Sequence, residues 1–271
     1  MGTKIAGFTI IETLLFLAIS GLMMVAMIAG VSVNLNTQRY NDSVRTFHTL
    51  IQEQYAKIAS TENDRPADRP CGLDATASPQ ENPSQPQIRG QSKCEVIGRY
   101  MAVEGSNIAI YPVLAYRNAT IDTATTDDIA LMRNASYMRL GIDSSLADTR
   151  LLEWGTEIAW PSTGSEARSQ RTPRSLALLF IRSPDSGQMY TFSSDSAPLS
   201  ADSINENTIR SMIVAGNTTP GQAARTICVD SAGLVLSSTL SIFVNGFATS
   251  STGIEMRTND YFKQLGTDIQ C

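Results

Sequence analysis

An uncharged apolar segment from Thr13 to Val33 constrains this chain more than any other feature. As an α-helix, a segment of 21 residues spans about 31 Å, close to the hydrocarbon thickness of a lipid bilayer. The sequence therefore predicts one membrane-spanning helix near the N-terminus. Lys4 precedes the segment and the next basic residue is Arg39, so the distribution of positive charge predicts a cytoplasmic N-terminus and an extracytoplasmic remainder.

An ordinary secretory signal peptide does not fit this segment. The apolar run is longer than the roughly 7 to 15 residues of a typical h-region, and no small-x-small cleavage site follows it cleanly. Glu12 is the one charge in a stretch that is otherwise apolar from Phe8 to Val33. An acidic side chain at the membrane centre costs roughly 2.5–3.5 kcal/mol, and less near the interface. The residues alone leave open whether Glu12 marks the interfacial edge of the helix or is kept inside it for a function.

The hexapeptide GFTIIE at positions 7–12 follows a short leader that carries Lys4 and directly precedes the apolar helix. This arrangement resembles the processing site of type IV prepilins and type II secretion pseudopilins. The resemblance implies that a prepilin peptidase cuts after Gly7 and that Phe8 becomes the N-methylated first residue. It also implies that Glu12, fifth after the cut, pairs with the α-amine of the adjoining subunit, since a buried charge without a partner is costly.

The resemblance covers roughly residues 1–55, and it has one departure. Gly21 stands where pilins commonly have a glycine, but Ala29 occupies the place of a proline that is often found further along. Gly21 and Gly30 weaken a helix without breaking it. A locally melted helix, which some pili have near these positions, is therefore less expected in this chain.

The helix is expected to continue past the membrane. Residues 33–59 contain neither proline nor glycine, so nothing in them breaks a helix. Apolar side chains recur there at steps of three or four residues, as on one face of an amphipathic helix. These are Val44, Phe47, Ile51, Tyr55 and Ile58.

The resemblance and the residue pattern together predict an α+β, pilin-like fold, with a long N-terminal helix packed on an antiparallel β-sheet head. The expected organisation has four parts. They are a leader peptide at 1–7, the long helix at 8–59 (about 13–33 transmembrane or filament core), a proline-rich exposed loop at 60–93, and an extracytoplasmic β-rich head at 94–271.

Within the head, two pairs of β-rich runs flank short turn signals. Cys94–Glu104 and Asn107–Arg117 are joined by a turn that contains glycine, which predicts a hairpin. Ser175–Arg182 and residues 188–193 flank the sequence SPDSG, which is a strong turn signal.

The C-terminal part of the head is also expected to be mostly strands. They are predicted at residues 226–230, 234–238 and 240–247. Residues 202–214 are instead expected to form a helix, with Ser203 and Glu206 as its capping box.

Four cysteines lie at positions 71, 94, 228 and 271, with no CxxC pair and a single histidine in the chain. This spacing makes a zinc site improbable, and an even number of cysteines in an exported chain favours two disulfides. Chain order favours Cys71–Cys94 with Cys228–Cys271, and the two other pairings stay open.

No catalytic pattern stands out, so we expect no enzymatic activity, no cofactor and no metal. The chain lacks GxSxG, P-loop, GxGxxG and HExxH sequences, and His48 lies beside the apolar helix stripe, which favours a structural role. The carboxylates of Asp127, Asp128, Glu153 and Glu157 are expected to be solvated. A net charge of −5 with dispersed basic residues argues against nucleic-acid binding as the main activity.

The resemblance implies a structural subunit of a type IV pilus or pseudopilus, most simply a large or minor pilin, that serves adhesion, motility, DNA uptake or secretion. The implied partners are other pilin subunits, the prepilin peptidase, the assembly platform, the membrane before assembly, and a host-cell surface. The implied location is the cytoplasmic (inner) membrane as a single-pass protein and then an extracellular pilus. The alternatives are a membrane-anchored binding module or adhesin outside a filament, and a tethered hydrolase, for which the sequence offers no catalytic centre.

Overall fold

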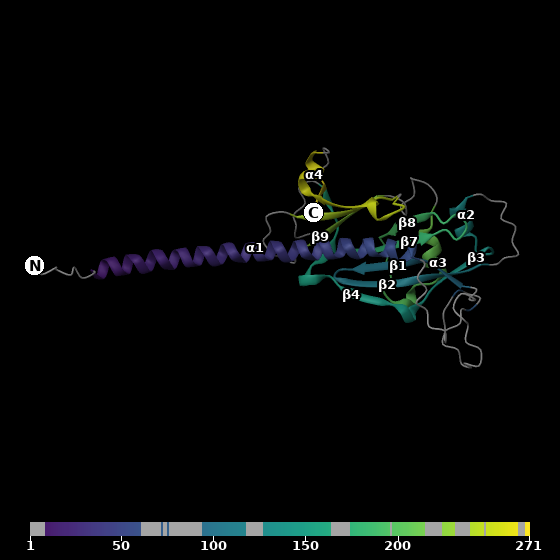
Figure 1. Ribbon diagram of the computed structural model, residues 1–271, viewed down its shortest axis with the longest axis horizontal. Helices are drawn as coiled ribbons and strands as arrows, with labels where there is room; N and C mark the ends of the chain where they lie inside the picture. Colours follow the sequence, from purple (N-terminus) through teal and green to yellow (C-terminus); the bar gives the residue numbers. More distant parts are fainter. Residues whose placement is uncertain are drawn as a thin grey trace, which may run out of the picture.

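The computed structural model describes residues 9–60, 72, 75, 94–117, 127–163, 174–195, 197–214, 224–230, 239–246, 248–264 and 269–271. One long helix carries a β-rich head at its C-terminal half (Figure 1). The prediction of an α+β fold, with a long apolar N-terminal helix and an antiparallel sheet, is confirmed. The predicted leader (1–7) and nearly all of the predicted loop (60–93) lie outside the described residues.

Helix α1 runs without interruption from Ile10 to Ala59. Its second half is amphipathic, and one stripe of this half is buried in the head. The spacing of three or four residues places these side chains on one face, as the sequence predicts. The buried residues are Tyr40, Ser43, Val44, Phe47, Leu50, Ile51, Gln54, Tyr55 and Ile58.

The main sheet is antiparallel, with strand order β3-β2-β1-β7-β8. β4 also pairs with β2, so that β3 and β4 share the outer edge of the long strand β2. The β1–β2 hairpin and β7 have the bounds that the sequence predicts. The strands are β1 (Cys94–Glu104), β2 (Asn107–Arg117), β3 (Met138–Ile142), β4 (Asp148–Leu151), β7 (Ser175–Arg182) and β8 (Met189–Ser194).

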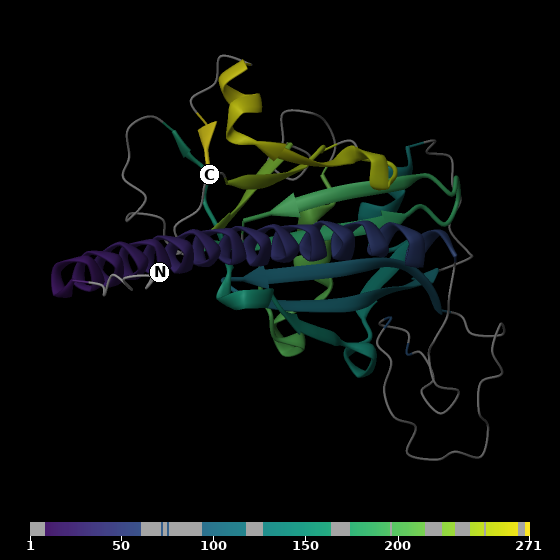
Figure 2. The same cartoon turned by 60° about the vertical axis from the view of Figure 1, so that its left-hand side comes forward.

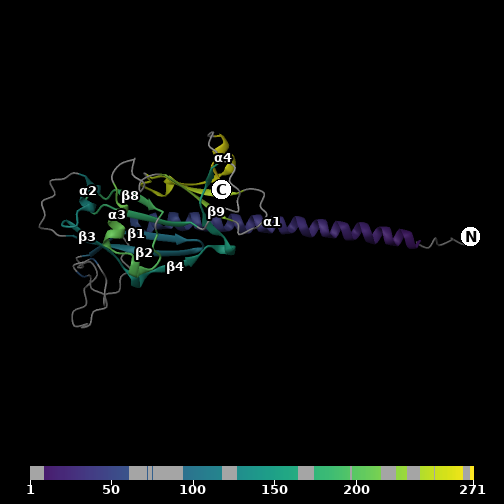
Figure 3. The same ribbon diagram turned by 180° about the vertical axis from the view of Figure 1, so that it is seen from behind.

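Both faces of the main sheet are covered, so its central strands are nearly continuous runs of buried residues. On one face, Met101, Leu178 and Phe180 pack against α1. On the other face, the short helices α2 (Asp128–Arg133) and α3 (Glu206–Met212) lie over a second core cluster (Figure 3).

A second antiparallel sheet lies on the α1 side of the head. Its order is β11-β10-β9-β5, and a two-stranded ribbon β12-β6 accompanies it. Figure 2 shows α1 running between the yellow strands of this sheet and the teal strands of the main sheet. The strands are β5 (Glu157–Ala159), β6 (Ser162–Thr163), β9 (Arg225–Asp230), β10 (Leu240–Val244), β11 (Ile254–Thr258) and β12 (Ile269–Gln270).

Short elements connect these layers. They are the 3₁₀ turns η1 (Ser144–Leu146), η2 (Glu153–Gly155), η4 (Ala201–Ser203) and η6 (Ser251–Gly253), and helix α4 (Asn259–Gln264).

The predicted helix over residues 202–214 is shorter than expected, and its predicted capping box is wrong. α3 begins at Glu206, and its cap is Asn205, whose side chain accepts from the Thr208 backbone while the Thr208 hydroxyl accepts from the Asn205 backbone. The Glu206 carboxylate instead binds Arg139 and Arg210. The Glu206 carboxylate is therefore used in ion pairs and does not cap the helix. Asn205 and Thr208, three residues apart, form the capping box in its place.

The other strand predictions shift by small amounts. The runs at 188–193, 226–230 and 240–247 become Met189–Ser194, Arg225–Asp230 and Leu240–Val244. The turn between β7 and β8 is the predicted one, closed by a bond from the Ser183 backbone amide to the Gln188 carbonyl. The strand predicted at 234–238 lies outside the described residues.

Cys228 of β9 is bonded to Cys271 in the structure, with their Cα atoms 5.0 Å apart. Both residues are buried, so the bond fastens residue 271 to the second sheet. This is the pairing that chain order favours. Cys94 is also disulfide-bonded, and its predicted partner, Cys71, lies outside the described residues.

We predict that the Cys228→Ala/Cys271→Ala variant is less stable than the wild-type protein by about 4 kcal/mol in the chain-entropy account, because the bond closes a loop with a sequence separation of 43. Urea unfolding of both proteins without reductant measures the difference. An unchanged midpoint would show that this bond contributes nothing to the stability of the head.

We predict a second loss of stability from Tyr40→Phe. The fully buried Tyr40 hydroxyl accepts from the Leu240 backbone amide at 2.9 Å and lies 3.1 Å from the Val229 carbonyl, so it joins α1 to β9 and β10. Removing it leaves a buried amide unpaired, at a cost of about 1–3 kcal/mol. Tyr116→Phe is the control, because the structure gives the Tyr116 hydroxyl no hydrogen bond within the described residues. Equal midpoints for both variants would refute this role.

Candidate functional site

The first half of α1 is the most unusual surface of the molecule. From Ile10 to Leu35 its side chains are exposed all round, with Ile10 at 81% and Phe16 at 72%. Figure 1 shows this half extending away from the head. Among the described residues, the large exposed apolar side chains elsewhere are Leu151, Trp154, Trp160, Met256 and Tyr261.

This half of α1 is long and apolar enough to cross a membrane, and its most apolar window is not buried anywhere in the structure. The core helix of a soluble protein would be buried, so that explanation does not apply. Exposed apolar patches far above a few hundred Å² mark contact with lipid or with other chains. The arrangement is consistent with a single-pass membrane anchor.

The beginning of α1 contains a polar pair that the sequence prediction overlooked. Thr9 is the N-cap: its hydroxyl oxygen accepts from the Glu12 backbone amide at 3.4 Å and lies 3.5 Å from the Glu12 carboxylate. The sequence Thr-x-x-Glu at positions 9–12 has the spacing of a capping box, so this helix start could have been predicted from the sequence. An acidic group in the first turn also interacts favourably with the helix dipole.

Glu12 therefore has a local role at the helix start whatever its partner in an assembly. The described residues bring no basic side chain to the Glu12 carboxylate. The predicted cleavage site, Gly7 and Phe8, lies outside the described residues.

His48, Asp127 and Asp128 have structural roles. His48 Nε2 lies 3.2 Å from the Ile254 carbonyl, which ties α1 to β11. Asp127 caps α2 through the Ile129 backbone amide, while Asp128 accepts from the hydroxyls of Ser186 and Tyr190. Within the described ranges, no group of three His, Cys, Asp or Glu side chains is placed to hold a metal ion.

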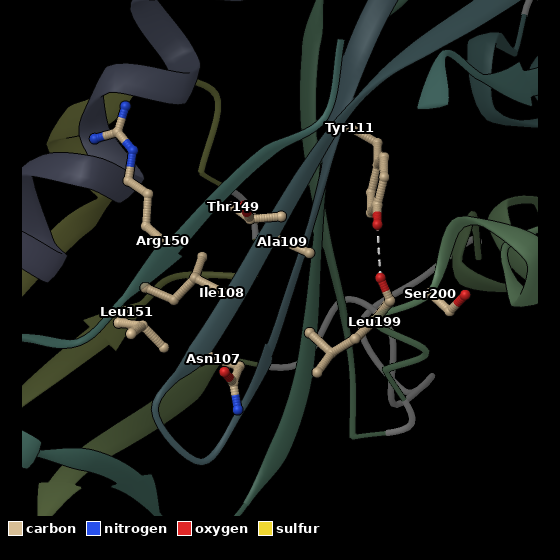
Figure 4. A pocket seen from close by; sticks show the side chains of 9 residues that line it. All are labelled: Asn107, Ile108, Ala109, Tyr111, Thr149, Arg150, Leu151, Leu199 and Ser200. Carbon is tan, nitrogen blue, oxygen red and sulfur yellow. Dashed lines mark hydrogen bonds between the residues drawn. The ribbon is translucent and has the colours of Figure 1, made fainter. Parts of the chain in front are cut away.

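The head also contains an open hollow of about 690 Å³ over β2 and β4. Figure 4 shows the side chains that line it, including Ala109 and Thr149 on the strands and Leu199 on the facing segment. The Tyr111 hydroxyl donates to the Leu199 carbonyl at 2.7 Å and fixes that wall. The Arg150 guanidinium binds Asp148 and reaches toward Glu53 of α1. The described residues that line the hollow include no Asp, Glu or His.

Comparisons with known proteins return no match to a family model, to a curated protein or to a solved structure.

Proposed function

We propose that this chain is a structural subunit of a type IV pilus or pseudopilus. One observation carries the proposal: an apolar helix that begins with a carboxylate at Glu12 continues into a head that leaves its whole first half uncovered. The pilin-like layout of one helix half in the head and one outside it supports the same conclusion.

In this proposal the uncovered half of α1 is covered first by lipid and later by other subunits. Before assembly the lipid bilayer covers it, because its length matches the hydrocarbon core. In the filament, the same half packs against the helices of other subunits, and Glu12 then leaves the interface for an apolar core. A carboxylate there needs a cationic partner, and the α-amine that cleavage creates at Phe8 of an adjoining subunit supplies one.

The partners and locations follow from these two environments. The prepilin peptidase, the assembly platform and other pilin subunits act on or bind α1, and the head faces the outside in both states. Cys228–Cys271 fits an oxidising, extracytoplasmic head. Adhesion, motility, DNA uptake and secretion all use such a subunit.

A membrane-anchored binding module outside any filament is the second candidate. The open hollow over β2 and β4 favours it, because a concave surface with apolar and polar lining is where small ligands bind. In that case α1 would only anchor the head, and Glu12 would only cap the helix.

We predict that the mature protein begins at Phe8 with a methylated amine. Gly7→Val should leave the leader attached, because a branched side chain replaces the small residue before the cut. Mass spectrometry of the N-terminal peptide from membranes checks both statements. A mature N-terminus near residue 30 would indicate an ordinary signal peptide and remove the filament proposal.

We predict that Glu12→Gln inserts into membranes and folds but enters filaments poorly. The amide keeps an oxygen for Thr9 but loses the charge, so the neighbouring amine would be buried unpaired at a cost of several kcal/mol. Loss of the charge should ease residence in the bilayer by less than the roughly 2.5 kcal/mol that a charged side chain costs at the membrane centre, because the amide remains polar. Glu12→Asp should be intermediate. The measurement is the ratio of protein in sheared filaments to protein in membranes.

Thr9→Ala is the matched control for that experiment. It removes the capping hydroxyl, worth about 1 kcal/mol, and keeps the carboxylate, so cleaved Thr9→Ala protein should enter filaments like wild type. An equal defect in Thr9→Ala and Glu12→Gln would show that helix capping, rather than charge pairing, limits assembly. Absence of the wild-type protein from filaments would favour the anchored binding module.

A further inference from the structure

A large aromatic side chain stands exposed where α1 enters the head. Trp154 of η2 has 54% of its surface exposed, and the guanidinium of Arg39 lies 5.0 Å from the centre of its ring. Arg39 itself belongs to the exposed turn of α1 just before Tyr40, the first side chain of the buried stripe. Trp154 therefore marks the border between the uncovered half of α1 and the head.

The backbone holds Trp154 in this position against its intrinsic preference. Its φ is 59° and its ψ is 23°, in the left-handed region that favours glycine over a side chain with a β-carbon. The next residue, Gly155, also has a positive φ of 71°. Strained positions of this kind persist where the surrounding structure fixes them, and they are frequent at functional surfaces. With 54% of its surface exposed, Trp154 buries less than half of itself in the fold.

Trp154 lies close to the point on α1 where a bilayer around the apolar run would end. Arg39 is six residues beyond Val33, the end of the uncharged run, so its Cα lies about 9 Å further along the helix axis. The polar headgroup layer extends about 5–7 Å beyond each side of the hydrocarbon. A tilt of about 20°, the average for membrane helices, lowers a side chain that stands beside the helix by roughly a further 3 Å. In a subunit inserted as far as Val33, a lean toward η2 would bring the ring that Arg39 contacts close to this layer.

The residues between the apolar run and the head suit the same layer. Asn34, Asn36 and Gln38 are polar, Arg39 is the first basic residue after the span, and Leu35 keeps one apolar side chain exposed among them. Tryptophan prefers this depth because its ring is apolar and its indole N–H is a donor, while an arginine can bind lipid phosphate. Leu151, at the end of β4 and 66% exposed, adds apolar surface close to η2.

We propose that Trp154, with Arg39 and Leu151, forms a docking surface that rests on the outer headgroup layer of the membrane and tilts the unassembled subunit toward η2. This inference rests on the membrane-resident state of the proposed function. Trp154 also lines a second hollow, formed by residues of α1, β4 and η2. Asp42 and Glu153 line it together with Arg45 and Arg150, so the surface is mixed in charge. Such a surface fits a zwitterionic lipid layer.

Tryptophan fluorescence tests the proposal directly, because the chain contains two tryptophans. The full-length Trp160→Phe variant, in which Trp154 is the only tryptophan, is reconstituted into phosphatidylcholine vesicles. We expect phospholipids brominated near the headgroup to quench its emission about twofold more than phospholipids brominated deep in the acyl chain, and iodide in the aqueous phase to quench it weakly.

The matched control moves the reporter to the other end of the head. The variant Trp154→Phe/Trp160→Phe/Ala130→Trp has its tryptophan on the exposed side of α2, which lies opposite the N-terminal end of α1 (Figure 1). Brominated lipid should leave its emission unchanged, and iodide should quench it. In both samples, resistance to carbonate extraction shows whether α1 is inserted.

The outcomes separate this inference from the proposed function. A chain that carbonate removes from the vesicles contradicts the membrane-resident state itself and the docking surface with it. An inserted chain whose Trp154 is open to iodide and insensitive to brominated lipid overturns the docking surface alone. If Trp154 becomes shielded only in assembled filaments, the surface contacts a second copy of the chain, and the lipid proposal is wrong.

A second variant separates docking from a structural role. Trp154→Gly relieves the left-handed backbone, so the head should keep its thermal midpoint. With the ring gone, a fluorophore attached to a cysteine at the exposed position Gln38, just beyond the apolar run, should lose about half of its quenching by shallow brominated lipid if the ring holds the tilt. A collapse of the midpoint with unchanged label quenching would assign Trp154 to the stability of the head and refute docking.

Discussion

The packing of one stripe of α1 between two sheets is the constraint on which the rest of the structure depends. Tyr40, Phe47 and Ile51 are almost fully buried, and they join the core face of the main sheet to the strands of the second sheet. The Tyr40 hydroxyl bonds β9 and β10, and the Ser43 hydroxyl bonds Thr156 beside β5. Without this helix both sheets would expose an apolar face to water.

The same packing sets the relation between the head and the uncovered half of α1. The helix is continuous from Ile10 to Ala59, so no flexible joint interrupts it where the packing begins at Tyr40. A tilt of the apolar half is therefore carried into the head through continuous helical backbone. This coupling suits the proposed filament subunit, whose helix would move from lipid into a filament, and it suits the proposed docking of Trp154 on the membrane surface.

Sequence patterns predicted the elements whose own residues carry a clear periodicity or turn signal. α1, the β1–β2 hairpin and β7 fall in this class, and so does the Cys228–Cys271 bond by chain order. The short strands β3, β4, β5 and β11 were not predicted, because three to five residues give too little pattern and pairing with distant strands decides them. The cap of α3 was misplaced for a related reason: Arg139, far away in sequence, binds Glu206.

The sequence by itself determined that this chain has a bilayer-length apolar helix, a carboxylate near its start and a β-rich head, and it favoured the Cys228–Cys271 bond without deciding it. The helix, its carboxylate and the strands follow from composition and from the spacing of residues that are close together in the sequence. Tertiary structure decided that the apolar half stays uncovered, that two sheets enclose the other half, and that Trp154 meets Arg39 at the border. The contacts join residues that are far apart in the sequence, such as Arg39 and Trp154, and only the folded chain brings them together.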